Sequence, residues 1–291
     1  MARRAAAVLA VTFLAAVGCD TDPPPVIEAK KSEGGKADQF ELKPPPRPAQ
    51  SEPAAALLLK EALDAHTGGK PDRLDRYKSV AYTRTGVMET PGGNVQSSWT
   101  FDLAWPDKYR LRTKLELAKD GAAFTQLDTF ALTPAGAWQA RAEVQSGQLP
   151  AEKRQRMAMD AEFARTLKAQ MNEDAVLFLF PLADPATVVS RGPDETLNGV
   201  AVVGLHVWTP ALEYALVSFD KKTKLLARVV YSGREMATNV VKEVVVTDNQ
   251  EFDGVKLPVK LTVKANRQNK GDWQKLTVTP GPIDPKVFDT P

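Results

Sequence analysis

Apolar and polar side chains alternate along two neighbouring stretches of the chain. Between residues 95 and 105 the apolar positions are Val95, Trp99, Phe101, Leu103 and Trp105. Between residues 109 and 117 they are Tyr109, Leu111, Leu115 and Leu117. A period of two predicts strands with one apolar and one polar face, and Pro106-Asp107 between the stretches predicts a turn. We therefore expect an antiparallel hairpin.

Similar runs recur along most of the chain and predict a large sheet. Turn signals separate them, among them Asn198-Gly199, the polar stretch 220–224 and Asp253-Gly254. The further runs cover residues 78–88, 124–133, 136–144, 198–208, 213–219, 224–232, 239–248, 256–265 and 272–279. With the first hairpin they make eleven strands. Strands in chain order with short turns predict an antiparallel meander, curled or closed, in a mainly β fold with some helix.

Two segments carry a helical pattern instead. Residues 54–66 contain no helix breaker before Gly68-Gly69, which predicts a helix with a glycine stop. Residues 151–180 lack Gly and Pro, and their large apolar residues recur every four positions, at Met159, Phe163, Leu167 and Met171. This predicts an amphipathic helix, followed by the apolar run 176–180, which we expect to be buried. The stripe is typical of core packing, but methionine also suits a surface that adapts to ligands.

The first residues have the features of an export signal. Arg3 and Arg4 precede the apolar run 5–17, which is shorter than the ~20 residues that span a bilayer. The run ends in Ala-Val-Gly-Cys19 and resembles the lipobox of bacterial lipoproteins, although that family more often has leucine where Ala16 stands. The resemblance implies that residues 1–18 are removed and that Cys19 is acylated, on its thiol and on its new amino terminus. An ordinary secretory signal with a chance cysteine is the alternative.

Residues 19–53 differ in composition from the rest of the chain. Prolines cluster at 23–25 and 44–46, and Phe40 is the one aromatic residue. Such a stretch buries too little apolar surface to offset its ordering entropy, so we expect a disordered tether reaching roughly 30 Å or more. A ligand for a proline-binding domain is the alternative. Residues 54–291 then form the folded domain.

The net charge and the expected acylation together indicate that lipid, and not charge, holds this protein on a membrane. The formal net charge is +2 and falls to zero once Arg3 and Arg4 leave, so neither nucleic acid nor an electrostatic membrane clamp is indicated. Acyl chains on Cys19 would hold the protein in the bacterial envelope, facing the periplasm, with each buried CH₂ contributing ~0.8 kcal/mol. Asp20, the residue after Cys19, resembles the signal that retains enterobacterial lipoproteins in the inner membrane. Outside that lineage the choice of membrane stays open.

The composition argues against an enzyme and against a cofactor. One cysteine and two histidines exclude an intramolecular disulfide framework and any zinc site built on several cysteines. His66 and His206 have no metal-binding spacing, and no G-x-S-x-G, P-loop or G-x-G-x-x-G motif occurs. Glu251 and Asp253 could act together, but they flank a turn, where Asp is favoured for backbone reasons. We therefore expect no catalytic residue, metal or cofactor.

The order of elements resembles the LolA/LolB outer-membrane lipoprotein-sorting proteins. The likeness rests on a short helix before a long meander, a helical insertion and three turn segments at 198–200, 219–225 and 252–258. In the last of these, Gly254, Leu257 and Pro258 match the family's G-x-x-L-P pattern. The resemblance implies a curved, incomplete barrel with a helical lid. It also implies an apolar cavity for acyl chains, lined by Trp99, Phe101, Leu103, Leu111 and Leu115, with Phe163 and Leu167 on the lid.

Two non-enzymatic functions follow from these expectations. In the first, the anchored domain binds acyl chains or a lipidated protein in its half-barrel and takes part in lipoprotein or lipid sorting, and the anchor fits the membrane-bound receptor half of the family. In the second, the same fold has a filled interior and serves as an interaction or sensor module in the envelope. Alternation cannot separate an open interior from a filled one, because inward positions of small barrels are usually filled.

Overall fold

A computed structural model describes residues 42–90, 93–119, 122–145, 156–235 and 238–289. The expected signal peptide, the acylated Cys19 and most of the expected tether lie outside these residues. Among the described residues, no helix combines the length and the apolar composition needed to cross a bilayer.

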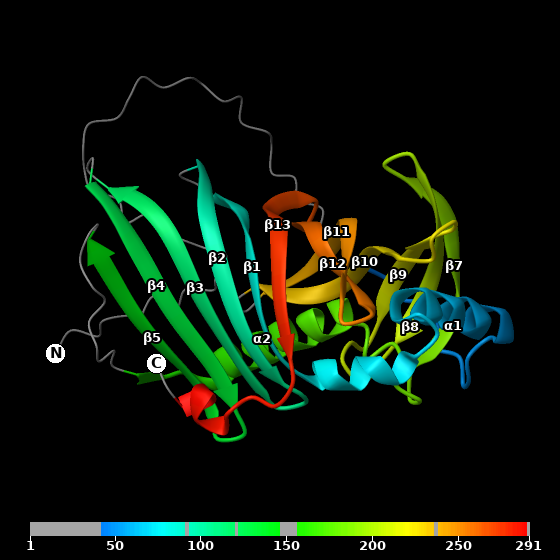
Figure 1. The fold of residues 1–291 in the computed structure, drawn as a ribbon, viewed down its shortest axis with the longest axis horizontal. Helices are drawn as coiled ribbons and strands as arrows, with labels where there is room; N and C mark the ends of the chain where they lie inside the picture. The colour runs from blue at the N-terminus through cyan, green and yellow to red at the C-terminus, as the bar shows by residue number, and fades with distance from the viewer. Residues whose placement is uncertain (1–41, 91–92, 120–121, 146–155, 236–237, 290–291) are drawn as a thin grey trace, which may run out of the picture.

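One antiparallel sheet of thirteen strands forms the body of the described chain (Figure 1). The first six strands are β1 (Ser79–Thr90), β2 (Gly93–Ala104), β3 (Lys108–Lys119), β4 (Ala122–Thr133), β5 (Gly136–Gln145) and β6 (Met157–Ala158). The others are β7 (Val188–Leu197), β8 (Val200–Trp208), β9 (Ala215–Asp220), β10 (Leu226–Glu235), β11 (Thr238–Phe252), β12 (Val255–Ala265) and β13 (Gln268–Pro280). The mainly β prediction is confirmed, and each of the eleven expected strands is present.

The strand order differs from a single meander in chain order. The sheet runs β6-β5-β4-β3-β2-β1-β13-β12-β11-β10-β9-β8-β7. The first half of the chain builds outward from the middle to one edge, and the second half builds inward from the other edge. β1 and β13 then pair at the centre, from Val80 opposite Pro280 to Met88 opposite Gly271. The sheet has two edges, β6 and β7, so it is curled and not closed.

The short strand β6 was missed because the predicted helix began too early. Met157 and Ala158 pair with Gln139 and Trp138. Helix α2 (Ala161–Leu177) starts only after Asp160, whose carboxylate accepts a hydrogen bond from the backbone N–H of Phe163 at 2.8 Å. An aspartate at this position satisfies an N–H that has no partner within the helix. The expectation of helix from residue 151 is therefore wrong for residues 157–160.

The edge strand β7 was missed because Gly192-Pro193 interrupts its pattern. Its register with β8 shifts between Arg191 and Asp194, which marks a bulge. Proline has no N–H to donate, and it is tolerated there because one side of an edge strand has no neighbour that needs such a donor. The two backbones approach so closely at this point that a Cβ on Gly204 would lie 2.6 Å from the carbonyl oxygen of Pro193. Glycine is therefore required opposite the bulge.

Helix α2 crosses one face of the sheet and shows how strongly the sheet curves. It packs against β3, β4 and β5 on one half and against β10 on the other half, although seven strands separate β5 from β10 in the sheet. Both halves can reach one helix only if the sheet bends around it, as Figure 1 shows. We call the face covered by α2 the concave face.

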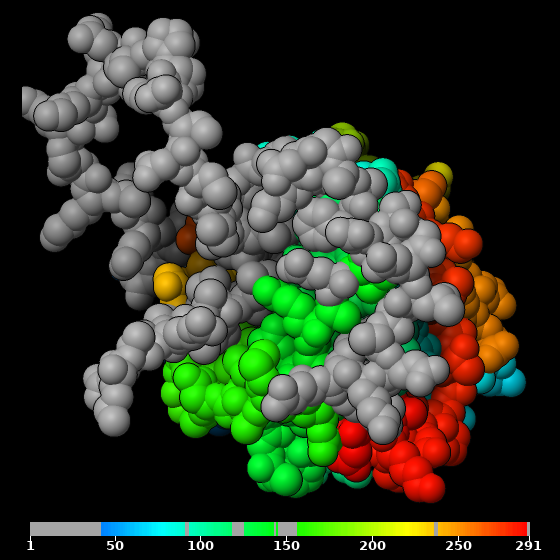
Figure 2. Space-filling model, turned by 90° about the vertical axis from the view of Figure 1, so that its left-hand side faces the viewer, coloured from blue at the N-terminus to red at the C-terminus, as the bar shows by residue number. Residues whose placement is uncertain are grey.

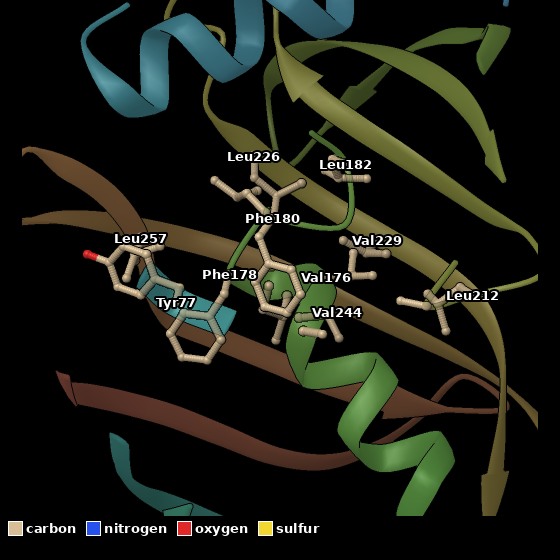
Figure 3. Close-up of a cluster of buried hydrophobic side chains, with 14 of the residues drawn as sticks. Tyr77, Val176, Phe178, Phe180, Leu182, Leu212, Leu226, Val229, Val244 and Leu257 are labelled. Carbon is tan, nitrogen blue, oxygen red and sulfur yellow. The ribbon is translucent and has the colours of Figure 1, made fainter. Parts of the chain in front are cut away.

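The chain after α2 fills the core at the centre of the concave face. The run from Val176 to Phe180 is buried, as expected, and Leu182 is buried with it. Phe178 stacks on Tyr77 with ring centroids 5.8 Å apart, and Figure 3 shows Phe178 and Phe180 among side chains from several strands. Tyr77 belongs to the 3-10 helix η1 (Pro71–Lys78). This end of α2 is therefore fixed on several sides.

Two further helical elements close the ends of the sheet. Helix α1 (Pro53–Thr67) packs on β7 and β12, and the 3-10 helix η2 (Pro285–Asp289) packs on β3 and β4. Figure 2 views the molecule from the side of β4 and β5, where the C-terminal segment with η2 lies beside them in red. Before α1, the backbone N–H of Glu52 donates to the carbonyl oxygen of Val189 at 2.9 Å, and the Ser51 hydroxyl accepts from the N–H of Val189 at 3.1 Å.

Candidate functional site

A cavity of about 100 Å³ lies between α2 and the concave face. Residues from α2 form one side, and residues from both halves of the sheet form the other. The wall comprises Arg84, Met88, Trp99, Phe101, Leu111, Phe163, Thr166, Leu167, Gln170, Glu173, Asp174, Leu177, Tyr231, Arg234, Glu235, Lys242, Val244, Val263, Lys270, Gly271 and Trp273.

Five of the seven predicted lining residues meet at this cavity. Trp99, Phe101 and Leu111 come from the sheet, and Phe163 and Leu167 come from α2. Leu103 and Leu115 are buried in the same core, at 0% and 6% exposure, but do not line the cavity. The structure therefore groups most of the predicted residues, and whether they bind lipid stays a prediction.

Aromatic side chains build the apolar part of the wall. Cross-strand partners place Tyr82, Phe101, Leu111 and Phe130 in one row across β1, β2, β3 and β4, and the two central members, Phe101 and Leu111, line the cavity. Tyr82 and Phe101 stack with centroids 4.4 Å apart. One step along the strands, Trp99 meets Trp273 of β13 edge to face at 4.9 Å. The apolar surface thus runs continuously through the central pairing of β1 and β13.

Buried charges form another part of the wall, and the sequence analysis missed them. Asp174 of α2 accepts from Arg84 Nη1 at 3.1 Å and from the Tyr109 hydroxyl at 2.6 Å. Its neighbour Glu173 accepts from Lys242 Nζ at 3.0 Å and 2.8 Å on its two oxygens. All five side chains are at most 7% exposed. The helix is thus joined to both halves of the sheet, to β1 and β3 through Asp174 and to β11 through Glu173.

Burial shifts the pKa of these groups. Loss of hydration raises the pKa of Glu173, and the ammonium of Lys242 opposes this shift. The pKa of Tyr109 lies well above its usual value because the ring is buried and the carboxylate of Asp174 faces it. Both effects keep Tyr109 protonated, so its hydroxyl donates to Asp174. Removing either partner would leave an uncompensated buried charge or a buried polar group without its bond.

A signal for this polar wall was present in the sequence. Arg84 lies two residues from Tyr82 and therefore on the same face of β1. Lys242 likewise shares a face of β11 with Val240 and Val244. A charged side chain at an inward position of an otherwise apolar face needs a buried partner. Searching the strands for such positions would have found both cations, whereas their helical partners follow only from the fold.

Three buried N–H groups of the cavity wall have no partner among the described residues. They are Nε of Arg84, Nε1 of Trp99 and Nε of Arg234. An unsatisfied buried donor costs ~1–3 kcal/mol, and native structures hold few of them. Their meeting around one cavity distinguishes it from the rest of the core.

A second hollow of about 370 Å³ lies at the turns after β7 and β9, beside β10 and β11. It is a surface depression next to the turn Asn198-Gly199, and Val200 on its rim is 44% exposed. None of the predicted lining residues reaches it. Although it is the larger hollow, it lacks the convergence of aromatic and polar groups found under α2.

The two histidines have structural partners. His66 Nε2 accepts from the backbone N–H of Leu226 at 2.8 Å, so Nδ1 carries the proton and donates to the carbonyl oxygen of Lys256 at 2.5 Å. Burial lowers the pKa of His66 to about 4. His206 Nδ1 lies 2.7 Å from the Tyr214 hydroxyl. Within the described ranges, no three His, Cys, Asp or Glu side chains are grouped so as to hold a metal ion.

The fold and the site together define an α+β domain in which a curved, open antiparallel sheet surrounds one helix. No known protein family and no curated protein matches the sequence. Among the solved structures that are similar to this one are three with a TM-score of 0.43 each. A DUF1329 family protein from Desulfovibrio piger is 12% identical, and the match covers 80% of this chain and 96% of that one.

The second and third come from Vibrio parahaemolyticus and Nitrosomonas europaea. An outer membrane lipoprotein-sorting protein domain from Vibrio parahaemolyticus is 13% identical, with 81% of this chain and 96% of that chain covered. A LolA superfamily protein from Nitrosomonas europaea is 8% identical, with 80% and 97% covered.

Proposed function

We propose that this domain binds acyl chains, free or attached to a protein, on its concave face beneath α2, and that Cys19 anchors it in the bacterial envelope. The observation that carries the proposal is the cavity under α2, where aromatic side chains from β2, β10, β13 and α2 converge. The lipobox resemblance supports the anchor.

The cavity must enlarge to take an acyl chain. Its volume of about 100 Å³ is below the ~300–1,000 Å³ typical of pockets for drug-sized ligands. The N-terminal half of α2 is the part able to move, because it buries only Phe163 and Leu167. The C-terminal half is buried at nearly every position from Met171 to Leu177. We therefore expect the helix to pivot near Gln170 and to uncover the space under its first turns.

The cost of this movement sets a minimum chain length. Exposing Phe163 and Leu167 costs ~1.5–3 kcal/mol for each side chain, or about 3–6 kcal/mol together, and each buried methylene returns ~0.8 kcal/mol. About four to eight methylenes therefore offset the opening, and longer chains give net affinity. We expect chains of about twelve carbons or more to bind and chains of about six to bind weakly or not at all.

A displacement assay tests the proposal. The mature chain with Cys19→Ser, which cannot be acylated, is stripped of lipid and titrated with a fluorescent fatty acid, then with unlabelled acids of increasing length. We expect saturable binding that Trp99→Asp abolishes. Leu57→Asp is the matched control, since Leu57 is 58% exposed on α1, away from the cavity.

The outcome separates the proposal from its alternative. If no fatty acid binds saturably and Trp99→Asp behaves like the parent, the acyl-chain proposal fails. The interior is then a packed core, and the domain serves as an interaction or sensor module through its outer face. Mass spectrometry of material that co-purifies with the parent would identify the natural ligand class.

A further inference from the structure

The three unpartnered N–H groups give the cavity under α2 a chemical preference beyond apolarity. Arg84 comes from β1, Trp99 from β2 and Arg234 from β10, so the donors reach one cavity from both halves of the sheet. Arg84 and Trp99 are 6% and 8% exposed. The Arg234 side chain is 27% exposed and its Nη2 is held by Glu162, but its Nε is buried like the other two donors, so bulk water does not hydrate the three N–H groups.

The carboxylates of the wall are already engaged. Asp174 is held by Arg84 Nη1 and Tyr109, and Glu173 is held by Lys242. Glu235 lies 3.9 Å from Lys270 Nζ. The free Nε donors of Arg84 and Arg234 therefore need an acceptor that the wall does not supply.

We propose that the cavity receives the anionic oxygen head group of a single-chain lipid, a carboxylate or a phosphate. This inference rests on the proposed function, and it adds the head-group class. Two of the three donors belong to guanidinium groups, which bond anionic oxygens more strongly than neutral ones. The hydrocarbon chain then continues along Phe101 and Leu111 beneath Phe163 and Leu167.

The test compares head groups on one chain length. The mature Cys19→Ser chain is titrated with dodecanoate, dodecyl phosphate, dodecanol and dodecylamine in the displacement assay. We expect one of the two anions to bind at least about tenfold more tightly than the alcohol, with the amine weakest. The tighter anion identifies the head group as carboxylate or phosphate.

Two conservative variants assign this preference to the donors. Trp99→Phe removes one donor and keeps an aromatic ring, and Arg234→Lys keeps the charge and removes Nε. Each should reduce the ratio of anion to alcohol affinity several-fold. Trp273→Phe is the matched control: it removes an indole from the same wall without removing an unpartnered donor. It should weaken anion and alcohol alike and leave their ratio unchanged.

The two proposals fail in different ways. If dodecanol binds as tightly as both anions, water satisfies the donors, and the head-group inference is overturned while acyl-chain binding stands. If none of the four probes binds, both proposals are overturned. If Trp273→Phe lowers the ratio as much as Trp99→Phe does, the donors do not set the preference, and the inference is again overturned. Thermal unfolding of each variant confirms that the compared proteins are folded.

Discussion

Acidification should destabilise the domain through His66. The imidazole is 1% exposed and joins α1 to β10 and β12 through one accepted and one donated hydrogen bond. Protonating Nε2 would remove the acceptor of the Leu226 N–H and leave a charge in the core. The neutral form is therefore the form that the fold requires.

The size of the effect follows from the two pKa values. Burial lowers the pKa of His66 from 6.5 to about 4 in the folded chain. As the pH falls below 6.5, the unfolded chain therefore takes up the proton first, and the free energy of unfolding decreases until the folded pKa is reached. Between pH 7 and pH 5 this single group should lower the free energy of unfolding by about 2 kcal/mol.

Urea unfolding followed by tryptophan fluorescence at several pH values between 5 and 7 measures this effect. His66→Gln is the control, because it removes the titration and leaves every other group in place. Burial raises the pKa of Glu173, which acts in the opposite sense, and burial lowers the pKa of His206, which acts in the same sense. Both are common to the two chains and cancel in the difference. If parent and variant lose stability equally on acidification, the argument from His66 is refuted.

Three further predictions concern stability and are measured as changes in the free energy of unfolding. Lys242→Ala leaves Glu173 buried without its cation and should cost about 3–5 kcal/mol, whereas the double variant Lys242→Met with Glu173→Leu should recover most of that loss; no recovery would contradict the pairing. Asp160→Ala removes the N-terminal cap of α2 and should cost ~1 kcal/mol, and an unchanged stability would mean that the cap is dispensable. Gly204→Ala places a Cβ 2.6 Å from the carbonyl oxygen of Pro193 and should cost about 1–3 kcal/mol, whereas an increase in stability would show that β7 yields without strain.

The strands were largely predictable because each is a local pattern. Alternation and turn residues found eleven of them, and the turn at Asn198-Gly199 has the positive φ angles, 49° and 83°, that such a dipeptide favours. The order of the strands was not predictable in the same way. Pairing of β1 with β13 depends on closing a loop of nearly the whole domain, and no local pattern records it.

The candidate site was predictable on its apolar side only. Trp99, Phe101 and Leu111 share a strand face, and Phe163 and Leu167 share a helix face, so periodicity groups them. The ion pairs join α2 to strands far away in the sequence. Which carboxylate pairs with which cation follows only from the folded structure, in which the sheet curves around the helix. Leu103 and Leu115 lie on the predicted face of their strands but beyond the cavity. Alternation predicts which face a residue occupies, and it does not predict how far along the strand the cavity extends.

The central seam between β1 and β13 also has a consequence for synthesis of the chain. Among the described strands, β1 is made first and β13 last, so β1 presents an open edge until almost all of the described domain has been made. Unpaired edges promote association between chains, and contacts between residues far apart in sequence form slowly. We therefore expect the chain to be most prone to aggregation while the sheet is incomplete. Loss of residues 268–280 would leave this edge of β1 permanently without its partner strand.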